Sequence, residues 1–518
     1  MASDRQSRPP RPSPIQATRE GQTLPSRPSP VRPTGEGEAG RARARAPSFL
    51  PSANCTSDRF GRQATEGGKA WLLALILLLT AVKGVLWSAA VPLWQGPDEN
   101  RHFAAIQYIA EHGRLPGEGD LYHDDENVLA GELTEVSRLW YNPEQRQTFG
   151  PGDEGPNEAA LAALDPSLRT STERGKITLA LHLPPLYYLL GVPLYLLARG
   201  GDILARVFAV RLLSVGMAVG AVALAAAIAR QVFPQRRVMW ATVPLLVSFQ
   251  PMFTLSTSTV NTDALLILVF CALIYLSIRV LKTRMTPGLA AGMGVCLAAG
   301  LLIKPFILAI AVPLAGVLAW DIARAIRRGA GLRRTLLCWG GMAAIVALLW
   351  GPWVWHSARL GNNPFYANPI RTGQLVVEHP FYDYRLTQYL VDYGRSLLGG
   401  TWATLWGYFG WLETALDPTA YRILYGVCAL ALVGLGVDVA RKVRARAWDT
   451  ELGLLGFLAL VGLSVVGTLG AINYYSWRAR GVGGGIQGRY YLGAIVPLAV
   501  LLAAGLTSGL PERWRPVG

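Results

Sequence analysis

Long apolar stretches separated by short polar segments recur along the chain from residue 71 onward. Residues 71–90, 207–229, 336–353 and 490–506 are four clear examples. A helix of about 20 apolar residues crosses the ~30 Å of hydrocarbon in a bilayer, and a helix satisfies its own backbone groups there. The pattern therefore predicts an all-α polytopic membrane protein with about 10–12 transmembrane helices.

The composition supports this fold class. Hydrophobic residues make up 51% and charged residues 16% of the 518 residues, as is typical of membrane proteins. The net charge of +15 comes from basic residues that flank the apolar stretches. This is the positive-inside pattern, so no nucleic-acid partner is expected. The five cysteines stand singly and indicate neither a disulfide framework nor a cysteine-based metal site.

Charge also assigns the two sides of the membrane. Residues 1–68 contain eleven arginines and little apolar periodicity, so we expect a disordered Pro/Arg-rich tail and a cytoplasmic N-terminus. Residues 92–181 contain 16 of the 34 acidic residues and seven basic ones. We therefore expect this large first loop outside the plasma (inner) membrane, with amphipathic helices in it. The same rule places outside the segments 256–263, 354–396 and 472–489 and the turn at Lys304.

The region after the first loop conflicts with the charge rule. Only one crossing fits between that loop and the basic turn at 230–237, yet two apolar segments, 183–198 and 203–229, lie there. The first segment is short and contains prolines. Two interpretations stay open: a tilted helix that is inserted in part, or one arginine cluster that breaks the rule.

An acidic pair, Asp98 and Glu99, opens the first external loop. Pro97 suits a first helical turn, and apolar residues at helical spacing continue to Gly113, which predicts an amphipathic helix on the membrane surface. Asp98 and Glu99 are four and three residues from His102, so these side chains can share one helix face. They could form a general base with its orienting group, or hold a divalent cation. Alternatively, Asp98 only satisfies the helix N-terminus.

Polar residues at the starts of later apolar segments face the same side. His182 precedes two prolines and could form a second wall of a site, and Asp263 is either a cavity carboxylate or a helix cap. Lys304 is a cation with apolar residues on both sides, and Arg489 with Tyr490 opens the last span after a glycine run. Such cations suit a lipid phosphate, or they anchor helices at the interface.

Aromatic and polar side chains alternate in 354–396, a mixture that suits either a sugar or the membrane interface. The tryptophan-rich segment 397–412 could re-enter the membrane without crossing it. The sequence has no P-loop, dinucleotide-binding fingerprint, GxSxG or HExxH motif. Soluble nucleotide chemistry therefore has no visible platform.

Taken in order, these motifs resemble the GT-C superfamily of membrane glycosyltransferases, and most closely a bacterial membrane-protein family of unknown function grouped with that clan. The matching stretches are Pro97-Asp98-Glu99 with His102-Phe103, Pro184–Tyr188, Asn261-Thr262-Asp263, Trp406–Trp411 and Gly488-Arg489-Tyr490. The resemblance implies a GT-C-like catalytic transmembrane module at 69–355. It further implies an external loop with a re-entrant segment at 356–418 and C-terminal transmembrane helices at 419–518.

The resemblance also implies transfer of a sugar from a polyprenyl-phosphate donor to a cell-envelope acceptor (a glycan, lipid or protein) on the external face, with inversion. Catalytic roles would fall to Asp98, Glu99 and His102, which could also surround a divalent cation; no other cofactor is implied. Substrate and carrier would contact His182, Asp263, Lys304, Arg489 and Tyr490. Cations stabilise charge on a phosphate leaving group, and a carboxylate can take the proton of an acceptor hydroxyl.

Two other functions stay open. A transporter or flippase of lipid-linked glycans would need charged residues at mid-membrane and an internal repeat. Lys83 is one charge well inside an early span, but no clear repeat is present. A non-catalytic membrane scaffold would use the acidic external loop to bind a partner.

Overall fold

A computed structural model describes residues 57–115, 124–136, 158–174, 184–329, 331–360, 364–365, 385–480 and 487–508. The chain divides into two compact units, Met1–Gly61 and Arg62–Gly518. Helix α1 (Ser57–Ala90) begins inside the segment expected to be a disordered tail, and its apolar part is Trp71–Ala90. Residues 1–56 lie outside the described part of the chain.

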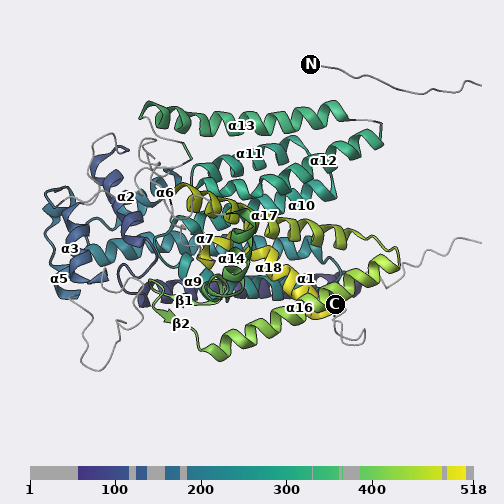
Figure 1. The fold of residues 1–518 in the computed structure, drawn as a ribbon, viewed down its shortest axis with the longest axis horizontal. Coiled ribbons are helices and arrows are strands. Elements are labelled where there is room, and N and C mark those ends of the chain that lie inside the picture. The colour runs from purple at the N-terminus through teal and green to yellow at the C-terminus, as the bar shows by residue number, and fades with distance from the viewer. Residues whose placement is uncertain are drawn as a thin grey trace, which may run out of the picture. The chain divides into compact units, whose positions relative to one another are not determined.

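Eight helices in the described residues are long and apolar enough to cross a membrane. Besides α1 they are α7 (Ile203–Val232), α10 (Thr262–Lys282), η3 (Pro305–Ile310) with α12 (Ala311–Arg327), α13 (Leu332–Arg359), α16 (Pro418–Arg444), α17 (Thr450–Arg480), and η4 (Gly488–Ala494) with α18 (Ile495–Ser508). Three shorter apolar helices accompany them: α6 (Leu186–Leu197), α8 (Met239–Ser248) and α11 (Pro287–Leu301). The predicted all-α polytopic membrane fold is confirmed (Figure 1).

The remaining elements lie between these helices. The first loop contains α2 (Glu99–His112), α3 (Asp125–Leu133), α5 (Glu158–Ala162) and η1 (Pro166–Arg169). Later come α9 (Pro251–Thr257), α14 (Leu386–Leu398), α15 (Gly400–Trp406) and a hairpin of β1 (Tyr408–Phe409) and β2 (Thr414–Ala415). Tyr408 pairs with Ala415 in antiparallel register, and this is the one sheet among the described residues.

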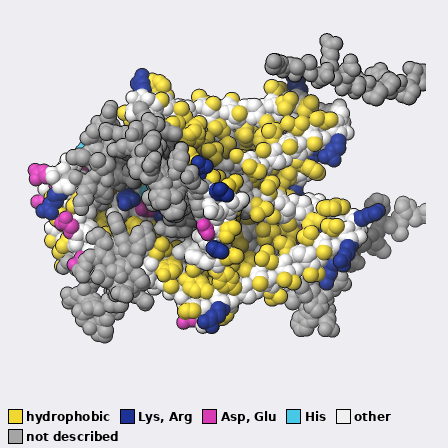
Figure 2. All heavy atoms as spheres, in the orientation of Figure 1, with side chains coloured by type: hydrophobic (Ala, Val, Ile, Leu, Met, Phe, Trp, Pro, Cys, Tyr) yellow, Lys and Arg dark blue, Asp and Glu magenta, His cyan; other side chains and the backbone are white. Residues whose placement is uncertain are grey.

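Burial separates central helices from lipid-facing ones. Most of the apolar window of α10 and of η4 with α18 is buried inside the protein, whereas α13, α16 and α1 expose most of theirs. An exposed helix that is apolar all round suits hydrocarbon rather than water. Figure 2 shows apolar side chains over α13 and α16, with charged side chains mostly towards the ends of these two helices.

Close helix contact depends on glycine where α16 meets α18. A Cβ added at Gly434 would lie 2.1 Å from the carbonyl oxygen of Gly505. Small residues let two membrane helices approach backbone to backbone, so no larger side chain fits at this crossing.

The structure gives the lengths of the short helices in the segments that the sequence left ambiguous. Helix α6 has 12 residues, which at 1.5 Å per residue gives about 18 Å, too short to cross ~30 Å of hydrocarbon. This favours the interpretation in which only α7, with 30 residues, crosses in that region. Helix α15 has seven residues and is likewise too short to cross.

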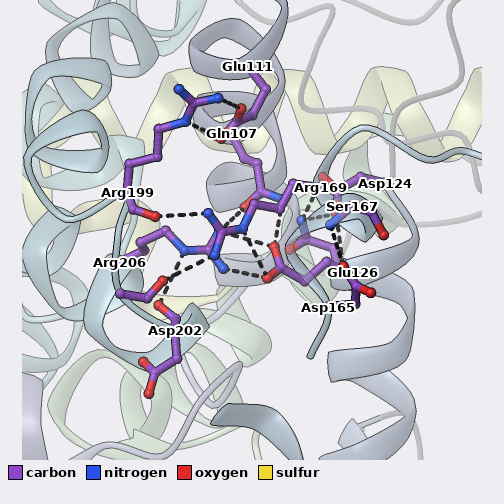
Figure 3. A network of polar contacts seen from close by, with 12 residues as sticks. Gln107, Glu111, Asp124, Glu126, Asp165, Ser167, Arg169, Arg199, Asp202 and Arg206 are labelled. Carbon is purple, nitrogen blue, oxygen red and sulfur yellow. Dashed lines mark hydrogen bonds and ion pairs between the residues drawn. The ribbon is translucent and has the colours of Figure 1, made fainter. Parts of the chain in front are cut away.

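A buried ionic network fastens the first loop to the membrane helices (Figure 3). Arg206 of α7 is fully buried and donates to the Glu126 carboxylate of α3, with Nη1 3.0 Å from Oε2. Gln107 of α2 joins the same pair, since its Nε2 donates to Glu126 and its Oε1 accepts from Arg206, both at 2.9 Å. Arg169 of η1 lies 3.6 Å from Glu126. Four elements therefore share one buried carboxylate, and this fixes α2 relative to α7.

Candidate functional site

Four charged residues from four segments meet at one place, and we call them the charged cluster. Asp98 precedes α2, Asp263 lies in the first turn of α10, Lys304 precedes η3 and Arg489 belongs to η4. The structure thus brings together four of the predicted site residues, which are up to 391 positions apart in the chain.

Arg489 is the centre of the charged cluster. Its Nη2 lies 2.7 Å from Asp98 Oδ2, and its Nη1 lies 3.7 Å from Asp263 Oδ2. Gln487 accepts from Nε at 2.7 Å, and the ring centre of Tyr490 lies 5.0 Å from the guanidinium carbon. The Arg489 side chain is only 3% exposed. A planar guanidinium with several donors can bridge two carboxylates in this way, which an ammonium cannot.

Lys304 completes the cluster from the other side of Asp263. Its Nζ lies 2.6 Å from Asp263 Oδ1. Two cations and two carboxylates balance one another, as buried charges require. Among the described residues, Asp263 Oδ2 and Arg489 Nη1 are buried without a hydrogen-bond partner. These two atoms face each other as an ion pair at 3.7 Å, so one can still accept and the other still donate a hydrogen bond to a further group.

Asp98 does not act as a side-chain helix cap. Its backbone is left-handed, with φ 60° and ψ 14°, and its side chain makes no capping hydrogen bond. A non-glycine residue in this region is strained, and such strain is concentrated at functional sites. Burial opposes ionisation of Asp98, but the charge of Arg489, its hydrogen bond to Asp98 and other nearby positive charges together outweigh burial and lower the Asp98 pKa. Asp98 is therefore a carboxylate at neutral pH, with a side chain 30% exposed.

Glu99 points away from the cluster, in contrast to the shared face expected from its spacing. Its two carboxylate oxygens accept from Arg211 Nε at 2.8 Å and Nη2 at 2.6 Å. Val260 N–H also donates to it at 2.9 Å. The physical reason is the partner that the fold supplies, because α7 places the buried Arg211 guanidinium against Glu99.

Arg211 is a residue that the sequence analysis missed. It donates to the backbone oxygens of Ser88 at 2.7 Å and Val91 at 2.6 Å, and so satisfies carbonyls at the end of α1. A charged residue inside the apolar run 207–229 was the signal that could have revealed it.

His102 pairs with a tyrosine rather than with a carboxylate. Its Nδ1 lies 3.0 Å from the hydroxyl of Tyr188. Burial and the nearby Lys304 charge lower the His102 pKa to about 3, so the ring is neutral at physiological pH. Tyr187 and Tyr188 are buried, in contrast to an interfacial aromatic belt. Tyr187 OH bonds Ser214 Oγ at 2.8 Å.

The side chain that caps α10 is that of Asn261, not that of Asp263. Asn261 Oδ1 accepts from Asp263 N–H at 2.8 Å and caps α10, while Asn261 Nδ2 donates to the Pro97 carbonyl at 3.1 Å. The Asp263 side chain is thereby left for the charged cluster. Asn261 also ties the start of α10 to the loop that carries Asp98.

A close backbone contact holds η4 beside α15. Gly488 N–H donates to Thr404 Oγ1 at 2.8 Å, and a Cβ at Gly488 would lie 1.9 Å from the Leu405 nitrogen. Only glycine allows this approach. The segment 397–412, which could re-enter the membrane, thus contacts the residue next to Arg489 and helps to position it.

The three predicted ligands of a divalent cation do not converge. Glu99 faces Arg211, His102 faces Tyr188, and Asp98 faces Arg489. No group of three or more His, Cys, Asp and Glu side chains in the described part of the chain could hold a metal ion. The residues as arranged therefore do not fit a cation. His182 lies outside the described residues.

Comparison with known proteins gives one family match and several similar structures. A family model described as a predicted membrane protein (DUF2142) matches residues 81–502. No curated protein matches the chain. The Archaeoglobus fulgidus oligosaccharyltransferase AglB, in complex with an inhibitory peptide and a dolichol-phosphate, is 13% identical with a TM-score of 0.47 and covers 85% of this chain and 50% of that one.

ArnT from Cupriavidus metallidurans in the apo state is 14% identical with a TM-score of 0.34, covering 86% of this chain and 78% of that one. The chain spans about half the length of the oligosaccharyltransferases that it matches. The family match agrees with the membrane-protein fold expected from the sequence.

Proposed function

The chain belongs to the DUF2142 family of membrane proteins, and we propose that it is a glycosyltransferase of the GT-C type. It moves a sugar from a polyprenyl-phosphate donor to a cell-envelope acceptor on the external face of the plasma membrane. One observation carries this proposal: a buried Arg489 and a partly buried Lys304 meet the carboxylates of Asp98 and Asp263 where helices begin or end.

The donor phosphate would bind the two cations. In the reaction, an acceptor oxygen attacks the anomeric carbon of the sugar while the bond from that carbon to the phosphate oxygen breaks. The electron pair of the broken bond stays on the phosphate, where Arg489 and Lys304 stabilise the added negative charge in a site of low dielectric. Attack opposite to the leaving group inverts the anomeric centre.

Asp98 would take the proton of the acceptor hydroxyl. Its lowered pKa makes it a weak base while Arg489 is its partner. A phosphate that draws Arg489 towards itself weakens this ion pair, which raises the proton affinity of Asp98 at the moment the donor is bound. Donor binding and base strength are thereby coupled through one guanidinium.

The remaining residues would position these groups. Asp263 holds Lys304 and Arg489 at their present separation, and Tyr490 packs beside the guanidinium. Glu99 with Arg211 fixes the start of α2 next to Asp98, and neutral His102 is held by Tyr188 one turn into the same helix. His182 stays a predicted substrate contact.

Transfer of a radiolabelled sugar from polyprenyl phosphate, with the full chain in detergent and titrated donor, tests the proposal. Arg489→Ala should raise the apparent donor requirement roughly 10- to 150-fold, since a hydrogen bond to a charged group contributes about 1.5–3 kcal/mol. Arg489→Lys should be impaired less, and Lys304→Ala should affect the donor but not the acceptor. Arg441→Ala, an exposed residue near the end of α16, is the matched control.

The other functions give different results in the same material. A scaffold shows no donor dependence. A flippase moves labelled lipid across a vesicle membrane without transferring its sugar. Equal donor curves for wild type and both alanine variants would mean that Arg489 and Lys304 are interface anchors.

A further inference from the structure

The turn that leads into α10 contains buried hydroxyl groups, some of which have a hydrogen-bond partner and some of which have none among the described residues. Every residue from 256 to 263 is at most 5% exposed. Thr257 and Thr259 donate to backbone oxygens one turn earlier, at 2.8 Å and 3.1 Å. The hydroxyl oxygens of the other three residues have no hydrogen-bond partner among the described residues; these are Ser256, Ser258 and Thr262.

Three such hydroxyls in seven residues are unusual. A hydroxyl in or next to a helix normally bonds a carbonyl three or four residues earlier, as Thr257 does. A buried polar atom without a partner lowers stability, so proteins contain few of them. Persistence of three in one turn indicates that another group satisfies them when the protein works.

The turn adjoins the charged cluster. Thr262 directly precedes Asp263, whose Oδ2 faces Arg489 Nη1 at 3.7 Å, and neither atom has a hydrogen-bond partner in the described part of the chain. Helix α9 packs against η4, which carries Arg489, and against β1. Ser256 lies one turn after Met252, whose sulfur accepts from Tyr408 N–H at 3.4 Å, so Ser256 is on the α9 face that looks towards that hairpin.

We propose that Ser256, Ser258 and Thr262, with Asp263 Oδ2 and Arg489 Nη1, bind hydroxyl groups of the sugar on the lipid donor. This inference rests on the proposed function and adds the place where the sugar lies. A sugar hydroxyl donates and accepts at once, which matches serine and threonine hydroxyls, a carboxylate oxygen and a guanidinium N–H. A phosphate, which only accepts, would use the cations but not the Asp263 oxygen.

The experiment compares two kinds of lipid with the purified full chain. One is polyprenyl phosphate without a sugar, and the other is a panel of polyprenyl phosphates that bear mannose, glucose or arabinose. Affinities are measured from intrinsic tryptophan fluorescence for wild type, Ser256→Ala, Ser258→Ala and Thr262→Val. Ser277→Ala is the control, because Ser277 is also buried and unpartnered among the described residues. It lies 14 residues beyond Asp263 in α10, roughly 21 Å away.

Each site variant should lose about 2- to 12-fold in affinity for the preferred sugar-bearing lipid, the range for one neutral hydrogen bond. The affinity for sugar-free lipid should stay within error, and Ser277→Ala should change neither. Without lipid, Ser256→Ala should melt at or above the wild-type temperature, because it removes an unsatisfied polar atom. Thr257→Val, which removes a bonded hydroxyl, should melt lower.

Two results would overturn the inference. One is equal loss for both kinds of lipid, or no loss, which is expected if ordered water satisfies these hydroxyls. The other is a wild type that binds every sugar-bearing lipid no better than the sugar-free one. A wild type that binds no lipid phosphate at all would instead contradict the proposed function.

Discussion

The side chains of Asp98, Glu99 and His102 show that spacing along a helix does not decide what each side chain contacts. Spacing alone predicts that they share a helix face. The three groups instead bond Arg489, Arg211 and Tyr188, which come from three different elements. These partners could not be assigned from the sequence, since each lies more than 80 residues away.

Asp98→Asn tests the proposed base. The variant keeps the shape of the side chain but cannot accept the acceptor proton, so turnover should fall about 10²–10⁴-fold. Arg489 keeps Asp263 and Gln487 as neighbours, so the melting temperature should change little. Sugar transfer and thermal unfolding in detergent are the two measurements. Glu132→Gln, an exposed carboxylate of α3, is the control. Turnover within a few-fold of wild type would show that Asp98 is not the base.

Glu99→Gln should have the opposite profile. It leaves the buried Arg211 guanidinium without a carboxylate, and breaking a buried pair in this way costs about 3–5 kcal/mol. Three backbone carbonyls still accept from Arg211, so we expect the lower end of that range. The melting temperature should drop clearly, and residual turnover per folded molecule should exceed that of Asp98→Asn.

Glu132→Gln is the matched control for this variant. Glu132 and its partner Arg174 are 56% and 53% exposed, and exposed ion pairs contribute at most about 1 kcal/mol. If Glu99→Gln melts like Glu132→Gln, Glu99 does not fix the start of α2. If it is stable but inactive, Glu99 acts in the chemistry.

The helices of the first loop are held in place by buried polar contacts that the hydrophobic periodicity of the sequence does not predict. Helix α2 is predictable from its apolar stripe, and its end at Gly113 is observed. The link from Gln107 through Glu126 to Arg206 is not predictable, because it joins α2, α3 and α7 through residues that each look like ordinary surface polar residues in the sequence. The family resemblance assigned the four residues of the charged cluster to one site, but their ion pairs with one another could not be predicted.

The cap of α3 gives a pH-dependent prediction. Burial raises the pKa of Asp124 to about 7, although hydrogen bonds from Asn127 oppose the shift. A folded pKa above the unfolded value near 3.8 means that Asp124 contributes stability at low pH. That contribution is lost as the pH rises from about 4 through about 7.

Asp124→Asn keeps an N-cap residue but does not titrate. Its melting temperature relative to wild type should therefore increase between pH 4.5 and pH 7.5, when both proteins are scanned in the same detergent. Asp165→Asn, the fully exposed cap of η1, is the control and should show no such rise. A difference that is constant across this range would place the Asp124 pKa near its ordinary value.

For the whole molecule, apolar runs were sufficient to find the spans, and their observed bounds contain all four examples given from the sequence. Runs report length and hydrophobicity directly, and length decides whether a helix can cross. Whether shorter helices such as α6 and α15 cross the membrane could not be predicted from apolar runs, because the depth of these helices depends on neighbours such as α7 and η4.

Sidedness is the remaining property, and it decides which donor can reach Asp98. We expect the first loop outside and the basic end of α16 in the cytoplasm, as the distribution of charge predicts. In a variant with all five native cysteines replaced by serine, a single cysteine at Glu132 or at Val443 provides an exposed reporter for each of the two expected sides. A membrane-impermeant maleimide added to intact cells should label the first and not the second, and inverted vesicles should give the reverse. The reverse pattern in intact cells would place Asp98 on the cytoplasmic side, where soluble nucleotide sugars are present. That result would contradict the proposed use of a polyprenyl-phosphate donor on the external face.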